Sequence, residues 1–184
     1  SEKQRPVSNL KFLGAASNNT EADITIIVDR SYDSAKYKNE IQTAVKEVAQ
    51  SMNGSGTLRI VSSSSIPVTE YIGSPDKIGD FNTDSLKNKP SAQAAVDLAL
   101  RLASNDLINA AKKRGIVLIT CGNQNAFTFD RYNLGELSSY LNNNSISFSV
   151  INVSQNALCP EISYITENTQ GDEYYVYRPQ GLND

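Results

Sequence analysis

The stretch ADITIIVDRSYDSAK, residues 22–36, decides how this chain folds. It begins with an almost unbroken run of apolar and β-branched side chains, which is typical of a strand buried on both faces. The run ends at Asp29, and Ser31 and Asp33 follow at alternate positions before a helical pattern begins at Ser34. A buried strand that leads directly into a helix predicts a parallel sheet covered by helices.

The rest of the chain repeats this alternation of strands and helices. Further strands are predicted at 57–65, 66–72, 115–120, 145–153 and 172–178, and helical segments at 34–52, 91–104, 105–114, 132–143 and 159–171. The strand 66–72 follows its predecessor after a tight turn, so we expect an antiparallel pair. The predicted fold class is α/β: a doubly wound, mostly parallel central sheet with one antiparallel edge strand and helices on both faces. We expect the strand that begins at residue 22 to lie in the middle of this sheet.

Two parts of the chain differ in composition. Residues 1–21 are polar and rich in Asn and Ser, and we predict a flexible arm or linker there. Residues 22–184 hold all the predicted strands and helices, and we predict that they form one domain. A domain of this length can bury a hydrophobic core of its own.

Charge and composition narrow the classes of function. The formal net charge is -3 at pH 7, and Lys and Arg never form a long basic run, which argues against a nucleic-acid partner. No apolar run approaches the roughly 20 residues of a membrane-spanning helix, so we expect no membrane insertion. The sequence contains no His, which excludes His-based triads and His metal ligands. We therefore predict that the protein is not an enzyme.

The two cysteines, Cys121 and Cys159, follow strands that we expect to be neighbours. Their sulfurs can therefore lie at the same end of the sheet, either as a disulfide bond or as buried free thiols, and the sequence leaves both open. Cys121 has no His and no cationic neighbour in the sequence to activate it as a nucleophile, so we predict no catalytic role.

The last predicted strand, 172–178, carries alternating tyrosines. Tyr175 and Tyr177 share one face, while Tyr174 and Val176 share the other. We predict an edge strand whose aromatic side chains cover the sheet or a flanking helix. An exposed aromatic face for a partner is the alternative.

The carboxyl ends of the strands, here called the top of the sheet, are where such folds bind ligands. The segment with Asp29, Ser31 and Asp33 and the segment 120–125 both follow strands, so we expect them to lie together there. Ser31 or Asp33 either contacts a ligand or caps the helix that follows.

Four segments resemble those of von Willebrand factor A-like (VWA) domains in order and spacing. They are ITIIVDRSYDS, AQAAVDLALRLA, RGIVLITCGNQN and ISYITENTQGDEYYVY, and the resemblance covers roughly residues 22–178. It implies a protein-interaction module, and for many members a metal-ion-dependent adhesion site (MIDAS) that holds Mg²⁺ at the top of the sheet.

That family's adhesion site takes an Asp-x-Ser-x-Ser motif, a Thr before the Ala/Leu-rich helix and a later Asp-Gly pair. Asp29 and Ser31 match the motif, and Asp33 stands where the second Ser is expected. The Thr position falls on Pro90, which has no hydroxyl, or on Ser91.

Cys121 replaces the Asp that precedes Gly122 in the Asp-Gly pair. Because a thiol is a soft ligand and Mg²⁺ prefers hard oxygen ligands, we predict a degenerate site that binds no metal tightly. No other cofactor is predicted.

The resulting hypothesis is a non-enzymatic protein–protein interaction module. It would recognise a protein partner, or another domain of the same polypeptide, through residues at the top of the sheet: Asp29, Ser31, Asp33, Ser91, Cys121 and Asn123. A bacterial, extracytoplasmic location is favoured. The alternative is a Mg²⁺-dependent adhesion-type domain that uses Asp29, Ser31 and Asp33. An enzyme of similar outline is a third hypothesis, which the lack of His and of a phosphate-binding loop disfavours.

Overall fold

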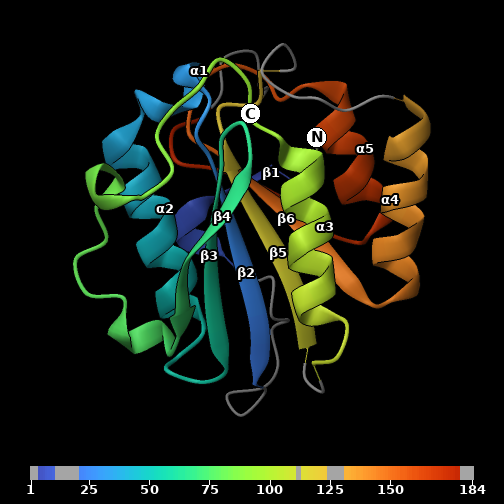
Figure 1. Ribbon diagram of the computed structural model, residues 1–184, viewed down its shortest axis with the longest axis horizontal. Helices are drawn as coiled ribbons and strands as arrows, with labels where there is room; N and C mark the ends of the chain where they lie inside the picture. The colour runs from blue at the N-terminus through green and yellow to red at the C-terminus, as the bar shows by residue number, and fades with distance from the viewer. Residues whose placement is uncertain (1–3, 11–20, 111–112, 124–130, 179–184) are drawn as a thin grey trace.

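A seven-stranded sheet forms the centre of the computed structural model (Figure 1), which describes residues 4–10, 21–110, 113–123 and 131–178. The strands are β1 (Gln4–Pro6), β2 (Ala22–Asp29), β3 (Thr57–Ser63), β4 (Pro67–Gly73), β5 (Lys113–Thr120), β6 (Ile146–Asn152) and β7 (Glu173–Tyr175). The α-helices are α1 (Tyr32–Ala35), α2 (Lys38–Ser51), α3 (Val96–Leu107), α4 (Arg131–Asn143) and α5 (Pro160–Asn168). Short 3₁₀ turns are η1 (Val7–Asn9), η2 (Pro75–Lys77) and η3 (Thr83–Ser85).

The strand order is β1-β7-β6-β5-β2-β3-β4, and β4 alone runs antiparallel to its neighbour. This confirms the predicted fold class, including the antiparallel edge strand. The strand β2 lies inside the sheet between β5 and β3, as expected for a strand that is apolar on both faces. The middle place itself belongs to β5.

Helices cover both faces of the sheet (Figure 1). On one face, α2 packs its apolar stripe of Ile41, Val45 and Val48 against Ile26 and Val28 of β2 in a single buried cluster. The other face is covered by α3, α4 and α5, and there Ile27 of β2 joins their buried side chains. Because successive strand residues point to opposite faces, one strand supplies both cores.

The helix predicted over 34–52 is two helices, α1 and α2, with a break at Lys36 and Tyr37. Tyr37 has φ -91° and ψ 52°, outside the helical region. The break lets Ser34 of α1 point toward the end of β2 while Ile41 of α2 faces the sheet.

The two helices predicted at 91–104 and 105–114 differ from the helix that the structure shows in this region. A single helix, α3, starts only at Val96, because Ser91 pairs with Ser31 in an isolated parallel bridge and the chain between is extended or turning. Its other end is at Leu107, and Lys113 and Arg114 already belong to β5. Pairing with β2 and β6 outweighs the helical preference of these two residues.

The strand β1 lies within the segment that the sequence assigns to a flexible arm. It pairs with β7 in parallel, and Val7, which follows it, is buried against the α2 face. The predicted edge position of the last strand is therefore wrong, because β1 covers that edge. The last strand, β7, is also shorter than predicted. Its Tyr174 is buried, while Tyr177, which lies beyond the strand, is exposed. The division of the chain at residue 21 stays a prediction, and residues 11–20 lie outside the described part.

Within the described ranges, no helix combines the length and the apolar character needed to cross a bilayer.

We expect Gly171→Ala to destabilise the protein strongly. A Cβ atom at Gly171 would overlap the backbone carbonyl of Phe148 in β6, so β6 and the chain entering β7 would have to separate. The free energy of unfolding should fall by about 3 kcal/mol or more, measured by urea denaturation. The control is Gly79→Ala, where φ is +64° and nothing lies within 4 Å, so only backbone strain of about 1 kcal/mol applies. Equal losses in both variants would contradict this account.

Candidate functional site

The carboxylate of Asp29 is the centre of the top of the sheet. It stands at the end of β2 and is fully buried. Its Oδ1 accepts the backbone N–H of Ser31 at 2.8 Å, and its Oδ2 accepts the hydroxyls of Ser34 at 2.7 Å and Thr120 at 2.6 Å. Both carboxylate oxygens are therefore occupied by donors of the protein itself.

The same hydroxyls extend the network into the segment after β5. The oxygen of Ser34 accepts the backbone N–H of Cys121 at 3.0 Å, and the oxygen of Thr120 accepts that of Gly122 at 2.9 Å. Each hydroxyl thus donates to Asp29 and accepts from a backbone amide. The two loops predicted to meet at the top do meet, and Asp29 joins them.

Ser31 serves as the N-cap of α1. It is fully buried, and its hydroxyl accepts the backbone N–H of Ser34 at 3.4 Å. Of the two roles left open for Ser31 and Asp33, this geometry gives the capping role to Ser31.

Ser91 lies beside Ser31 through backbone pairing. The N–H of Tyr32 donates to the carbonyl of Ser91 at 2.9 Å, and the N–H of Ser91 donates to the carbonyl of Arg30 at 3.1 Å. The hydroxyl of Ser91 lies 2.8 Å from the hydroxyl oxygen of Ser64 and donates to the carbonyl of Gln93 at 2.5 Å. The Ser91 hydroxyl is therefore hydrogen-bonded within the protein.

Asp33 and Asn123 form the outer part of the site. The carboxylate of Asp33 accepts a hydrogen bond from the side-chain nitrogen of Asn123, and both residues are half-buried. All six residues singled out in the sequence thus lie at the top of the sheet, joined through these contacts.

A pocket of about 420 Å³ opens beside Asp33. Its lining residues come from the α1–α2 junction and from the segments after β5 and β6: Asp33, Lys36, Tyr37, Cys121, Gly122, Asn123, Asn156, Ala157 and Cys159. Both cysteines therefore contribute to one concave surface.

Cys121 and Cys159 are buried free thiols. Burial raises the pKa of Cys121, and it raises the pKa of Cys159 to about 11. Both thiols are therefore protonated at neutral pH, which makes them weak nucleophiles and weak metal ligands. Of the two states that the sequence left open, the structure has the free thiols.

Sequence reasoning missed Ser34 and Thr120, the two hydroxyl donors to Asp29. The sequence pattern places Ser34 at the start of a helix and Thr120 at the end of an apolar strand, and it gives neither hydroxyl a role in the site. The available signal was that Thr120 ends its strand at the top, as Asp29 does, with a side chain able to donate a hydrogen bond.

The segment 74–95, here called the strap, connects β4 to α3. It passes outside α2 and crosses near α1 before it enters α3 (Figure 1). Glu70 of β4 anchors it, accepting the backbone N–H groups of Lys87 at 2.9 Å and Asn88 at 3.1 Å and the hydroxyl of Ser62 at 2.6 Å. Burial by itself would raise the pKa of Glu70, but these hydrogen bonds outweigh it and the pKa is lowered.

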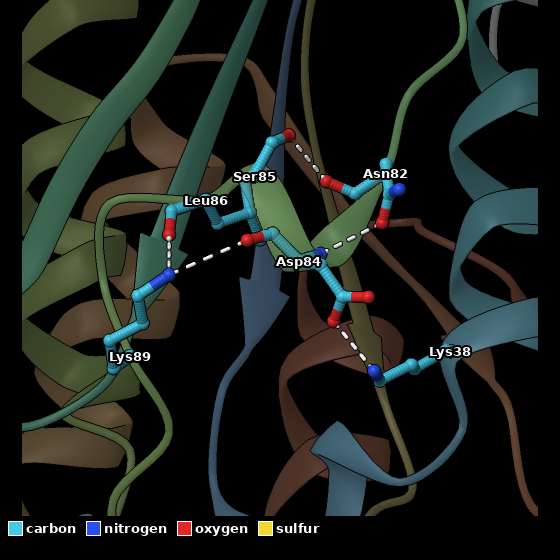
Figure 2. Close-up of polar contacts among 6 residues, drawn as sticks. All are labelled: Lys38, Asn82, Asp84, Ser85, Leu86 and Lys89. Carbon is cyan, nitrogen blue, oxygen red and sulfur yellow. Dashed lines mark hydrogen bonds and ion pairs between the residues drawn. The ribbon is translucent and has the colours of Figure 1, made fainter.

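A polar cluster fastens the strap to α2, as Figure 2 shows. The side chain of Asn82 accepts the backbone N–H of Asp84 at 2.9 Å, which shapes the η3 turn. Lys38, the first residue of α2, pairs with the Asp84 carboxylate at 2.6 Å and lowers its pKa. Lys89 donates to the carbonyl of Leu86 at 3.0 Å. The strap, which carries Ser91, is therefore held at several points.

Arg30 is buried under the strap and donates to the carbonyl of Asn88 at 3.2 Å. Burial lowers the pKa of this guanidinium, while the carboxylates of Glu70, Asp84 and Asp29 act in the opposite direction. Arginine remains charged even so, because its ordinary pKa lies far above neutrality.

Solved structures with the same arrangement of strands and helices identify the fold. The SpRpn10 VWA domain matches with a TM-score of 0.64 at 13% identity, over 89% of this chain and 90% of that chain. The chain has a von Willebrand factor A-like fold.

Two further structures agree with this VWA-like fold. A von Willebrand factor type A protein from Catenulispora acidiphila has a TM-score of 0.67 at 14% identity, over 87% of this chain and 39% of that one. Proximal thread matrix protein 1 from the mussel byssus, with a zinc-occupied MIDAS motif, has a TM-score of 0.61 at 14% identity, over 85% and 41%. The match thus spans less than half of either protein. No family model and no curated protein matches the chain.

We expect Glu70→Gln to loosen the strap and to do so in a pH-dependent way. At pH 7 the free energy of unfolding should fall by about 1–2 kcal/mol, because a neutral amide cannot replace a carboxylate that accepts three hydrogen bonds. The lowered pKa means that Glu70 stabilises the folded state above its ordinary value of 4.5 and loses this effect as pH falls through the folded-state value. The difference from the natural protein should therefore shrink below about pH 4.5, measured by urea denaturation at several pH values.

The matched control is Glu167→Gln, at an exposed position of α5, which should change the free energy of unfolding little at any pH. A Glu70→Gln effect that stays constant from pH 7 to the acid range would contradict the role given to the carboxylate.

Proposed function

We propose that this VWA-like chain is a non-enzymatic protein-interaction module that recognises a protein partner, or a neighbouring domain of its own polypeptide, through the top of the sheet without binding a metal tightly. The observation that carries the proposal is the state of Asp29. Its side chain is fully buried and both carboxylate oxygens accept hydrogen bonds from the protein. A carboxylate used in this way stabilises the loops and is withdrawn from ligand binding.

The donor set at the adhesion-site positions does not fit Mg²⁺. This ion requires near-octahedral oxygen ligands at about 2.0–2.1 Å. Asp29 would have to give up the hydroxyls of Ser34 and Thr120, and Ser31 would have to stop capping α1. Cys121 offers a protonated thiol in place of a carboxylate. Among the residues that the structure describes, no group of three or more His, Cys, Asp and Glu side chains could hold a metal ion.

The absence of catalysis is inferred from the chemistry of the same residues. The two thiols have raised pKa values, and the sequence contains no His to act as a base. The residues in reach of each other at the top are amides, hydroxyls and carboxylates that bond to one another. Such groups can form a recognition surface, and in the part of the chain that the structure describes none of them is a thiolate or an imidazole base.

Recognition through the top is supported by what that surface exposes. Tyr32 of α1 is 63% exposed beside the half-buried pair of Asp33 and Asn123. Tyrosines are enriched among the residues that dominate protein interfaces, because they bury a large area and still carry a polar group. The loops themselves rest on a rigid sheet, which is where binding residues commonly lie.

The alternative function, Mg²⁺-dependent adhesion through Asp29, Ser31 and Asp33, is tested by titration calorimetry. We expect the natural protein to show no binding of Mg²⁺, Mn²⁺ or Ca²⁺ tighter than about 1 mM. Cys121→Asp should gain affinity for Mg²⁺ relative to Cys121→Ser, because only the former restores a hard anionic ligand. A dissociation constant in the micromolar range for the natural protein would replace the proposal with the alternative.

The interaction itself is tested on a partner captured from an extract of the source organism by the immobilised chain. We expect the affinity of the identified partner to be the same in Mg²⁺ and in a chelator. Tyr32→Ala should weaken binding about tenfold or more, equivalent to about 1.4 kcal/mol. The control, Tyr164→Ala, removes an exposed tyrosine from α5 and should have no effect. Loss of binding in chelator, or no response to Tyr32→Ala, would refute recognition as proposed.

A further inference from the structure

We propose that the pocket beside Asp33 receives an arginine side chain of the protein partner. The inference rests on the proposed function and adds the chemical class of the group that is bound. It assigns to this surface a preference for a cation, whereas a metal-filled adhesion site of the family accepts an acidic residue.

The shape of the pocket suits one long side chain. Its volume of about 420 Å³ falls within the range of about 300–1,000 Å³ that is usual for ligand pockets. Cys121 and Cys159 are buried against it and present weakly polar thiol groups. Asn123 and Asn156 also line the pocket, and an asparagine side chain carries both a hydrogen-bond donor and an acceptor. An arginine needs this combination of an apolar path for its stem and acceptors for its guanidinium.

The wall around Cys121 carries negative charge, and Lys36, which also lines the pocket, carries a positive charge from an exposed position. Asp33 is half-buried on the wall, and the hydrogen bond from Asn123 holds its carboxylate in place. Asp29 lies behind the pocket, linked through Ser34 to the backbone of Cys121. Burial is the main cause of the raised pKa of Cys121, and the charges of Asp29 and Asp33 raise it further, which agrees with a negative potential at this wall.

The aromatic wall of the pocket already carries a cation. The ammonium of Lys36 lies 5.8 Å from the centre of the Tyr37 ring, within the range of a cation–π interaction. Lys36 is exposed, so its flexible side chain can leave the ring without disturbing the core. We interpret Lys36 as an internal stand-in that an incoming guanidinium displaces, since the planar guanidinium stacks on the ring and also pairs with the Asp33 carboxylate.

The test is a nuclear magnetic resonance titration of the ¹⁵N-labelled chain with N-acetyl-arginine methylamide. The controls are the citrulline analogue, which has nearly the same shape without the charge, and the glutamate analogue, which has the opposite charge. We expect the arginine probe to shift the amide signals of Cys121 and Asn123 saturably, with a dissociation constant in the millimolar range, about that of a single anchoring side chain. The other two probes should bind at least about fivefold more weakly.

Variants separate the contributions of the pocket. Asp33→Asn should weaken binding of the arginine probe about fivefold or more, because it removes the fixed charge while keeping the size of the side chain. Lys36→Met should strengthen binding about threefold, because the internal competitor is gone. Lys46→Met removes an exposed lysine of α2 outside the pocket and should leave the affinity unchanged. The amide spectrum of each variant reports whether it is folded.

Three results would overturn the inference: no saturable shift with the arginine probe up to about 20 mM, equal binding of the citrulline probe, or preferred binding of the glutamate probe. None of them bears on the proposed function, which depends on partner binding in chelator and on Tyr32. Conversely, a partner that requires a metal would refute the proposed function even if the arginine probe binds.

Discussion

Burial of the Asp29 carboxylate is the constraint on which the top of this molecule depends. A charged group without contact to water must have its oxygens hydrogen-bonded, because an unpaired buried charge costs several kcal/mol. Besides the backbone N–H of Ser31, the donors are the hydroxyls of Ser34, five positions away in the sequence, and of Thr120, 91 positions away. Satisfying one carboxylate therefore brings together the loops after β2 and β5, and through the shared hydroxyls it also holds the backbone of Cys121 and Gly122.

The same constraint has a consequence for binding. Asp29 is engaged in the fold, and the thiol at position 121 is buried and protonated. In the proposed function, recognition depends on the groups that still reach the surface. Tyr32, Asp33 and Asn123 are such groups, and they stand on loops that the Asp29 network and the strap hold in place.

The strands and helices differ in how far local sequence patterns predict them. The buried strand β2 and the amphipathic helix α2 were predictable, because the spacing of apolar residues differs between a buried strand and a helix and can be recognised locally. The break at Tyr37 and the start of α3 at Val96 could not be predicted in this way, because both depend on tertiary contacts that override helical propensity. The strand β1 was missed for a related reason, since Gln4, Arg5 and Pro6 carry no strand pattern of their own and pair with the sheet because β7 offers an open edge.

The sequence by itself determined the α/β class, the interior place of β2 and the meeting of two loops at the top. These follow from local periodicity and from the identity of single residues, which need no partner to be recognised. Only the tertiary structure decided that Thr120 and Ser34 bond to Asp29, that Ser31 caps α1, and that both thiols stay free beside one pocket. Such contacts join side chains whose separation in the sequence carries no signal, because hydrogen-bond partners are chosen by distance in space.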